Sequence, residues 1–90
     1  MANSIKDFKK DINYVFGEVI DEVNYKQLVN PDVDEDKAAA IIEEAVTAYE
    51  DFYEKINAGR KAENKKAYYK ELTQAVEKAV KELVDKINAL

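Results

Sequence analysis

The sequence predicts an all-α fold, an up-down-up antiparallel three-helix bundle. Three observations predict it. Apolar residues recur at steps of three and four in three long segments, short polar stretches separate those segments, and no segment alternates with the period of two that is typical of a strand. Short connections make neighbouring helices antiparallel. A chain of 90 residues suffices for one domain, so we expect a single domain over residues 1–90.

The first helix is expected over about residues 4–28, with Ser4 as its N-cap. It must end by Asn30, because Pro31 disfavours helical geometry in the residue before it. Its predicted core stripe consists of Ile5, Phe8, Ile12, Val15, Phe16, Val19, Ile20 and Val23.

The second helix is expected over about residues 34–57. Asp34, Glu35 and Asp36 place negative charge at its N-terminus, where the helix dipole is positive. Gly59 is expected to end it in the left-handed conformation that glycine adopts without steric cost. Its predicted core stripe consists of Ala38, Ile41, Ile42, Ala45, Val46, Tyr49, Phe52, Tyr53 and Ile56.

The third helix is expected over about residues 62–89. Oppositely charged residues four apart, such as Glu77, Lys81 and Asp85, predict a ladder of ion pairs on its polar face. Its predicted core stripe consists of Tyr69, Leu72, Val76, Ala79, Val80, Leu83, Val84, Ile87 and Leu90. The topology places Phe8, Phe52, Tyr53 and Tyr69 at one end of the bundle, where we expect an aromatic layer.

The composition excludes several chemistries. The chain has no cysteine and no histidine, which removes disulfides, thiolate chemistry and the commonest metal ligand and general base. Adjacent carboxylates on a helix diverge by about 100° and share no site, and two glycines are too few for a phosphate-binding loop. We therefore expect no enzyme and no cofactor.

The charge and hydropathy suggest where the protein works. A net charge of −5 and a pI of about 4.8 argue against nucleic acid and anionic membrane as partners, because Lys and Arg supply most of that affinity. The charge is uneven, since residues 31–59 carry two basic and nine acidic side chains, whereas residues 60–90 carry eight and five. No apolar stretch is long enough for a signal peptide or a membrane span, which predicts a cytoplasmic protein.

The acidic segment before the second helix resembles part of a calcium loop. Asp32, Asp34, Asp36 and Glu43 occupy positions 1, 3, 5 and 12 of an EF-hand pattern. The glycine required at position 6 is replaced by Lys37, and the following residues are typical of a helix. We interpret the segment chiefly as an acidic helix N-terminus, with weak calcium binding as the alternative.

A basic aromatic segment opens the third helix. Lys65, Tyr68 and Lys70 interleave cations with a ring on which a base or another anionic ligand could stack. Most of these charges are expected to be solvated, so anion binding is also an alternative.

One stripe lies on the side of the first helix away from the core. Tyr14, Gly17, Asp21, Tyr25 and Leu28 follow one another at steps of three, four, four and three. Glycine inside a helix costs about 1 kcal/mol relative to alanine, so we expect a neighbour to approach Gly17 closely. Tyrosine is enriched in interfaces. The stripe predicts a protein interface, either with a protein partner or in a homodimer, and a non-enzymatic interaction module.

The segment from Lys6 to Val15, together with Asn30-Pro31-Asp32, resembles small conserved bacterial helical proteins of unknown function. The resemblance covers mostly the first helix and the turn after it. It implies a natural bacterial protein, and it assigns no site.

Overall fold

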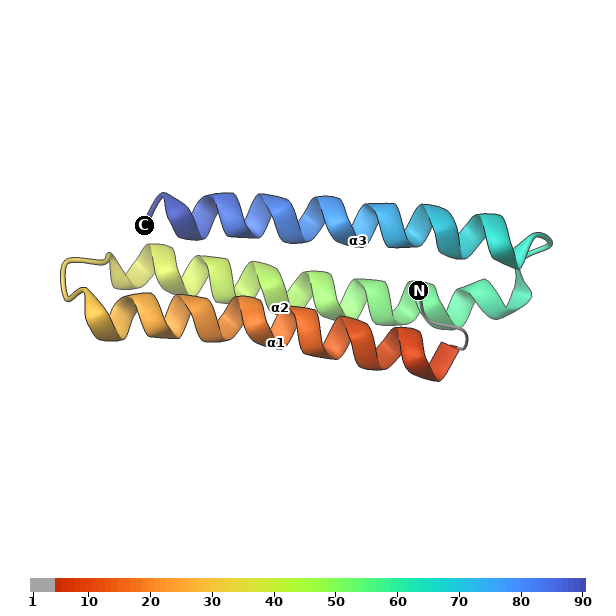
Figure 1. Cartoon of the computed structure of the whole chain (residues 1–90), viewed down its shortest axis with the longest axis horizontal. Coiled ribbons are helices and arrows are strands. Elements are labelled where there is room, and N and C mark those ends of the chain that lie inside the picture. Colours follow the sequence, from red (N-terminus) through yellow and green to blue (C-terminus); the bar gives the residue numbers. More distant parts are fainter. Residues whose placement is uncertain (1–4) are drawn as a thin grey trace.

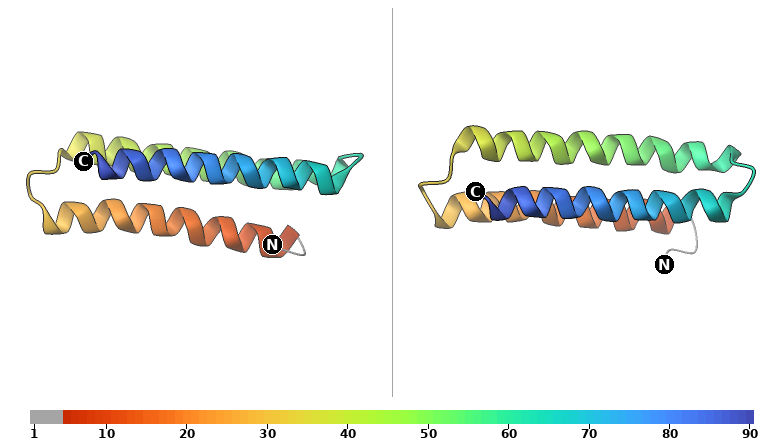
Figure 2. Two further views of the ribbon diagram at one scale, coloured as in Figure 1. Left: turned by 45° about the horizontal axis from the view of Figure 1, so that its top comes forward. Right: turned by 90° about the horizontal axis from the view of Figure 1, so that it is seen from above.

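The computed structural model describes residues 5–90 and confirms the three-helix bundle. Helices α1 (Ile5–Val29), α2 (Glu35–Ala58) and α3 (Lys65–Asn88) follow one another, with a short 3₁₀ turn, η1 (Gly59–Lys61), before α3. They form a rod of 49 × 16 × 16 Å in which α1 and α3 run parallel and α2 runs antiparallel to both (Figure 1). The two turned views in Figure 2 show a triangular arrangement, because a different helix stands apart in each.

The helix ends lie close to the predicted bounds. The expected N-cap, Ser4, falls outside the described residues. Helix α3 begins later than expected, at Lys65, because the side chain of Asn64 caps it by accepting a hydrogen bond from the amide of Ala67 at 3.1 Å.

The core is built from the predicted stripes. Among residues 5–90, no polar or charged side chain is buried. The buried set also includes Val33, from the loop between α1 and α2; it consists of Ile12, Phe16, Val19, Val23, Val33, Ala38, Ile41, Ala45, Phe52, Ile56, Leu72, Val76, Leu83 and Ile87. Two residues predicted for the core, Val46 and Val84, stay 40% and 41% exposed. The apolar stripes are therefore wider than the core they form.

Aromatic rings gather toward the turn between α2 and α3. The ring centroids of Phe8 and Tyr69 lie 5.9 Å apart. The cluster extends further along the bundle than expected, because Phe16 packs against both Phe52, at 6.1 Å, and Tyr49, at 6.3 Å. Such tilted and edge-on contacts are favourable for aromatic rings.

The prediction that Gly59 adopts a left-handed conformation is wrong. Its φ of −63° and ψ of −17° are right-handed, and no residue from 5 to 90 has a positive φ. Glycine is needed there for space instead. A Cβ atom on Gly59 would lie 2.6 Å from Cε1 of Tyr68 and 2.7 Å from Cζ of Tyr69.

Both of these tyrosine rings are held in place by hydrogen bonds to the end of α2. The hydroxyl of Tyr68 donates to the carbonyl of Lys55 at 2.7 Å, and that of Tyr69 donates to the carbonyl of Ile56 at 2.8 Å. Burial raises the pKa of Tyr69 above its ordinary value of 10.0; the neighbouring Tyr68 adds to this effect and Arg60 opposes it.

The turn between α1 and α2 is closed by side-chain caps. Asp34 caps α2, since its Oδ1 atom accepts hydrogen bonds from the amides of Asp36 at 2.8 Å and Lys37 at 3.2 Å. In the same turn, Oδ1 of Asn30 accepts from the amide of Asp32 at 3.0 Å. These bonds satisfy amides that a helix start or turn leaves without partners.

The predicted ladder of ion pairs along α3 does not form among residues 5–90. Lys86 instead reaches across to α2 and pairs with Glu44 at 2.7 Å. A second ion pair joins Lys55 to Asp51, one turn apart on α2.

Candidate interaction surface

The outer face of α1, defined by Tyr14, Gly17, Asp21, Tyr25 and Leu28, is exposed along its whole length. Its large side chains are among the most exposed apolar and aromatic residues of the molecule: Tyr14 is 70% exposed, Tyr25 61% and Leu28 82%. The helical spacing places all five residues on one side of α1, and the structure keeps that side free of α2 and α3.

Gly17 forms a notch in this face. A Cβ atom at Gly17 would meet nothing within 4 Å, so no part of the described chain approaches it closely. Beside the notch, a depression of about 180 Å³ lies between α1 and α2. It is lined by Asn13, Phe16, Gly17, Ile20, Val46 and Tyr49. The expected close neighbour of Gly17 is thus not supplied by residues 5–90, which leave the notch open to a side chain from outside.

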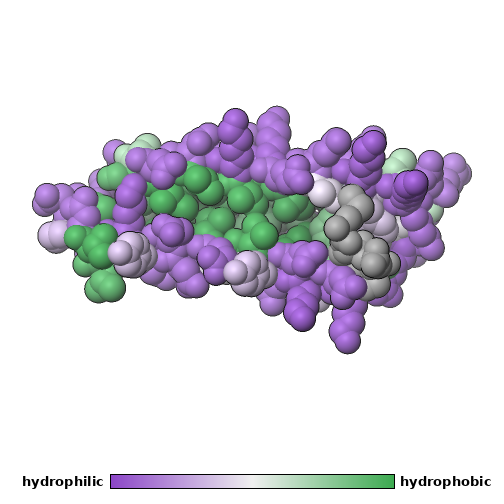
Figure 3. Space-filling model, in the orientation of Figure 1, coloured by the Kyte–Doolittle hydropathy of each residue, from purple (hydrophilic) through white to green (hydrophobic). Residues whose placement is uncertain are grey.

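The outer face of α1 ends in an apolar cluster that sequence analysis did not identify. Val29 is 57% exposed and follows the 82% exposed Leu28 at the end of the helix. Figure 3 shows an apolar cluster at this end of the molecule, where α1 meets the turn into α2. The spacing of four residues between Tyr25 and Val29 was the available signal.

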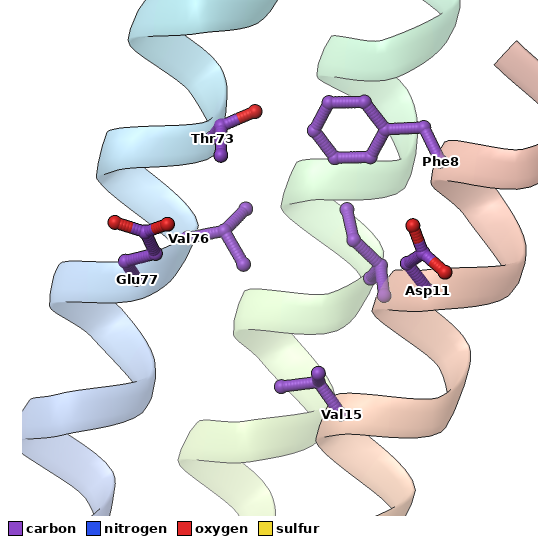
Figure 4. Close-up of a pocket in the computed structure, with 7 residues that line it drawn as sticks. Phe8, Asp11, Val15, Thr73, Val76 and Glu77 are labelled. Carbon is purple, nitrogen blue, oxygen red and sulfur yellow. The ribbon is translucent and has the colours of Figure 1, made fainter. Parts of the chain in front are cut away.

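A second exposed apolar surface lies between α1 and α3. Figure 3 shows an apolar band running lengthwise between these helices, with hydrophilic residues on both sides. Part of the band is a groove of about 230 Å³. The residues lining it are drawn in Figure 4; they are Phe8, Asp11, Ile12 and Val15 from α1 and Thr73, Val76 and Glu77 from α3. The periodicity of the sequence predicts the apolar members for the core, and the groove between the helices was not predicted.

Chemically, the groove offers apolar contact and negative charge. The one hydroxyl in its lining, that of Thr73, donates to the carbonyl of Tyr69 at 2.8 Å within α3. Asp11 and Glu77 are exposed and stand on opposite sides of the groove (Figure 4).

The candidate calcium ligands are not brought together. Oδ1 of Asp34 is engaged as the N-cap of α2. Asp36 and Glu43 lie on the same side of α2 but two turns apart, about 10 Å along the axis. Within residues 5–90, no group of three or more carboxylates is placed to hold a metal ion.

The candidate anion-binding residues also diverge. Tyr68 and Lys70 are two positions apart on α3, so they point to nearly opposite sides of the helix. Tyr68 packs against the core, and its hydroxyl is bonded to Lys55. Lys65 and Lys70 are exposed; Lys65 lies about one turn before Tyr68 on the same side of α3, whereas Lys70 points away from it.

Comparison of the chain with protein-family models, with curated proteins and with solved structures finds no match. In the described part of the chain, no helix has the length and apolar character needed to cross a membrane.

Proposed function

We propose that the protein is a non-enzymatic interaction module that binds another protein, or a second copy of itself, through the outer face of α1. The observation that carries the proposal is the exposure of Tyr14, Tyr25 and Leu28 along one stripe of a single helix. Burial of side chains of this size contributes about 1.5–3 kcal/mol each, and tyrosine can bury its ring while its hydroxyl stays paired.

The notch at Gly17 supports the same proposal. It lies within the stripe and opens onto the depression lined by Ile20, Val46 and Tyr49. A large side chain of a partner fits such a hollow, and contacts of this kind account for much of the affinity of protein interfaces. The calcium alternative has no group of three or more candidate ligands placed together within residues 5–90, and in the anion alternative Lys70 points away from Tyr68.

The test for self-association is the molar mass measured by light scattering after gel filtration, over a range of protein concentrations. A homodimer is expected to revert to a monomer in the Tyr25→Glu and Tyr14→Ala variants. Asn57→Glu is a matched control for Tyr25→Glu, because it adds the same charge at an exposed position on α2. A wild-type monomer at all concentrations rejects the homodimer.

The test for a different partner is photo-crosslinking in cells of the native host. A photoreactive residue replaces Tyr25 in one variant and Asn57, which is exposed on α2, in another. Discrete adducts are expected from position 25 alone, and the Tyr14→Ala change should weaken them. The proposal is wrong if the protein is monomeric and the crosslinking fails to single out position 25, either because both positions give the same adducts or because neither gives any.

A further inference from the structure

The groove between α1 and α3 is left open by residues 5–90. Phe8 packs against Tyr69, and Nζ of Lys26 donates to the carbonyl of Ile87 at 2.7 Å; both pairs are 61 positions apart. The two helices therefore run in a constant register. Val76 lines the groove and Val84, two turns further along α3, is 41% exposed. The apolar surface thus extends along the bundle beyond the hollow itself.

The two sides of the hollow are acidic. Among the described residues, neither Asp11 on α1 nor Glu77 on α3 has an ion-pair or hydrogen-bond partner for its carboxylate. Glu18 and Glu22 follow Asp11 at steps of seven and four, so they continue the same side of α1. Both are exposed. A ligand in the groove therefore meets an apolar floor and a row of unpaired negative charges.

Exposed tyrosines flank this row. Tyr14 comes three positions after Asp11, and Tyr25 three positions after Glu22, so each ring neighbours a carboxylate on the surface of α1. A carboxylate beside an aromatic face suits a guanidinium or ammonium group, which pairs with the first and stacks on the second.

We propose that this groove binds an amphipathic helix of a partner protein, with an apolar stripe on one side and Arg or Lys along its flank. The inference rests on the proposed function, since it takes the partner to be a protein, and it adds the chemistry of the partner and a second contact surface. A helix lying antiparallel to α1 and α3 completes a four-helix bundle, a common packing solution for exposed helix faces.

Charge decides between this occupant and a second copy of the chain. Two copies facing each other across this groove bring together surfaces that each carry Asp11 and Glu77, on molecules of net charge −5. Like charges at an interface are unfavourable. Another acidic depression, on α2, is lined by Ala40, Glu43, Glu44, Thr47, Ala48 and Asp51. Its apolar groups are small, and no side chain as large as Phe8 lines it.

The experiment uses a synthetic helical peptide of about 20 residues, enough to span the groove at 1.5 Å per residue. The peptide carries leucines on one face and arginines on its flank, and its binding is measured by fluorescence anisotropy. A second peptide has glutamates in place of the arginines. We expect saturable binding of the first peptide alone, weakening as salt rises because the contacts include ion pairs. On addition of the arginine peptide, the largest changes in amide chemical shift are expected at residues 8–22 and 73–84.

Charge reversal at the groove should weaken binding while leaving the fold intact. The double variant Asp11→Lys with Glu77→Lys should raise the Kd of the arginine peptide by roughly tenfold or more. Val84→Ser should raise it by a few-fold through lost apolar contact. The matched control is the double variant Glu50→Lys with Glu54→Lys, which makes the same charge change at two exposed positions on α2. Circular dichroism checks that each variant stays helical.

Several outcomes overturn the inference. They are no saturable binding, equal binding of the glutamate peptide, equal weakening by the Glu50→Lys with Glu54→Lys control, or amide shifts confined to α2. A dimer broken by the groove variants would assign the groove to a second copy instead. Leu28→Ser reports on the outer face of α1 alone. If Leu28→Ser abolishes association or crosslinking while the groove variants bind the peptide normally, the inference fails and the proposed function stands. If Leu28→Ser leaves association and crosslinking unchanged while the groove variants lose peptide binding, the outer face of α1 is rejected and the groove is kept.

Discussion

The two turns of the bundle are closed by different kinds of contact. Between α2 and α3, two tyrosine rings lie against the backbone at Gly59, and their hydroxyls bond to the carbonyls of Lys55 and Ile56. Between α1 and α2, the hydrogen bonds are local, with Oδ1 of Asn30 and of Asp34 accepting from nearby amides, and Val33 is buried against the core. The α2–α3 turn is closed by side chains that reach across from another helix, whereas the α1–α2 turn combines local caps with one buried side chain.

The two ends of the bundle also differ in how many apolar and aromatic side chains stay exposed. At the α2–α3 turn, the aromatic side chains Tyr68 and Tyr69 are used to pack the chain against itself. At the other end, Leu28 and Val29 remain exposed beside a turn that does not need them. Apolar side chains that do not contribute to the fold are available for a partner, which is why we place the proposed interface on α1.

The largest expected effect comes from Gly59→Ala. The new Cβ atom must displace the rings of Tyr68 and Tyr69, whose contacts at 2.6 and 2.7 Å leave no room for it. Overpacking of this kind costs about 1–3 kcal/mol, so we expect the free energy of unfolding to fall by about 2 kcal/mol. Urea denaturation followed by circular dichroism measures it. An unchanged midpoint would mean that the rings move aside freely, and that this turn is no more dependent on packing than the other.

The polar turn should be sensitive to loss of its cap. Asp34→Ala removes the acceptor for the amides of Asp36 and Lys37, and loss of an N-cap costs about 1 kcal/mol. Asp34→Asn is the matched control, because it keeps the cap oxygen while removing the charge. Denaturation midpoints of the two variants should differ clearly. If both variants lose the same stability, the charge rather than the cap stabilises the start of α2.

The sequence predicted the stripes and the turns better than the contacts between them. Helical periodicity identifies which side of α1 is apolar, but not how far α1 stands from α3. The groove lined by Val15 and Val76 was therefore missed. Gly59 was correctly predicted at the end of a helix, but the predicted reason for a glycine there was wrong. Glycine is needed for space, and that need depends on tyrosines nine and ten positions away. The exposed stripe on α1 was predictable because a residue far from the core stripe on a helix faces away from the bundle.

The tyrosine contacts at the α2–α3 turn predict a loss of stability at high pH. The pKa of Tyr69 is raised in the folded state, so as the pH rises the hydroxyl loses its proton in the unfolded chain before it does so in the folded protein. The stability that the protonated hydroxyl contributes is therefore fully present below pH 10 and is lost as the pH rises through the folded-state pKa. The Tyr69→Phe change should lower the free energy of unfolding by about 1 kcal/mol at neutral pH. Between about pH 9 and 11, the free energy of unfolding of this variant should fall less steeply than that of the wild type.

Tyr14→Phe is the control for this measurement, because the hydroxyl of Tyr14 lies on a ring that is 70% exposed. Urea denaturation at a series of pH values should give the same alkaline slope for this variant as for the wild type. A wild-type slope in Tyr69→Phe as well would show that other groups dominate the alkaline transition, and that the bond to Ile56 contributes little to it.

The smallest expected effect is a gain in the free energy of unfolding, and it compares the two glycines of the chain. Gly17→Ala places a methyl group where nothing lies within 4 Å, in the middle of α1. Alanine is favoured over glycine in a helix interior by about 0.5–1 kcal/mol, so this variant should be more stable than the wild type, whereas Gly59→Ala is less stable. If a partner side chain enters the notch, the same methyl group should weaken association, because it fills the space the partner needs. A variant that is more stable but associates normally would leave the glycine without a role in binding and move the contact toward Tyr25 and Leu28.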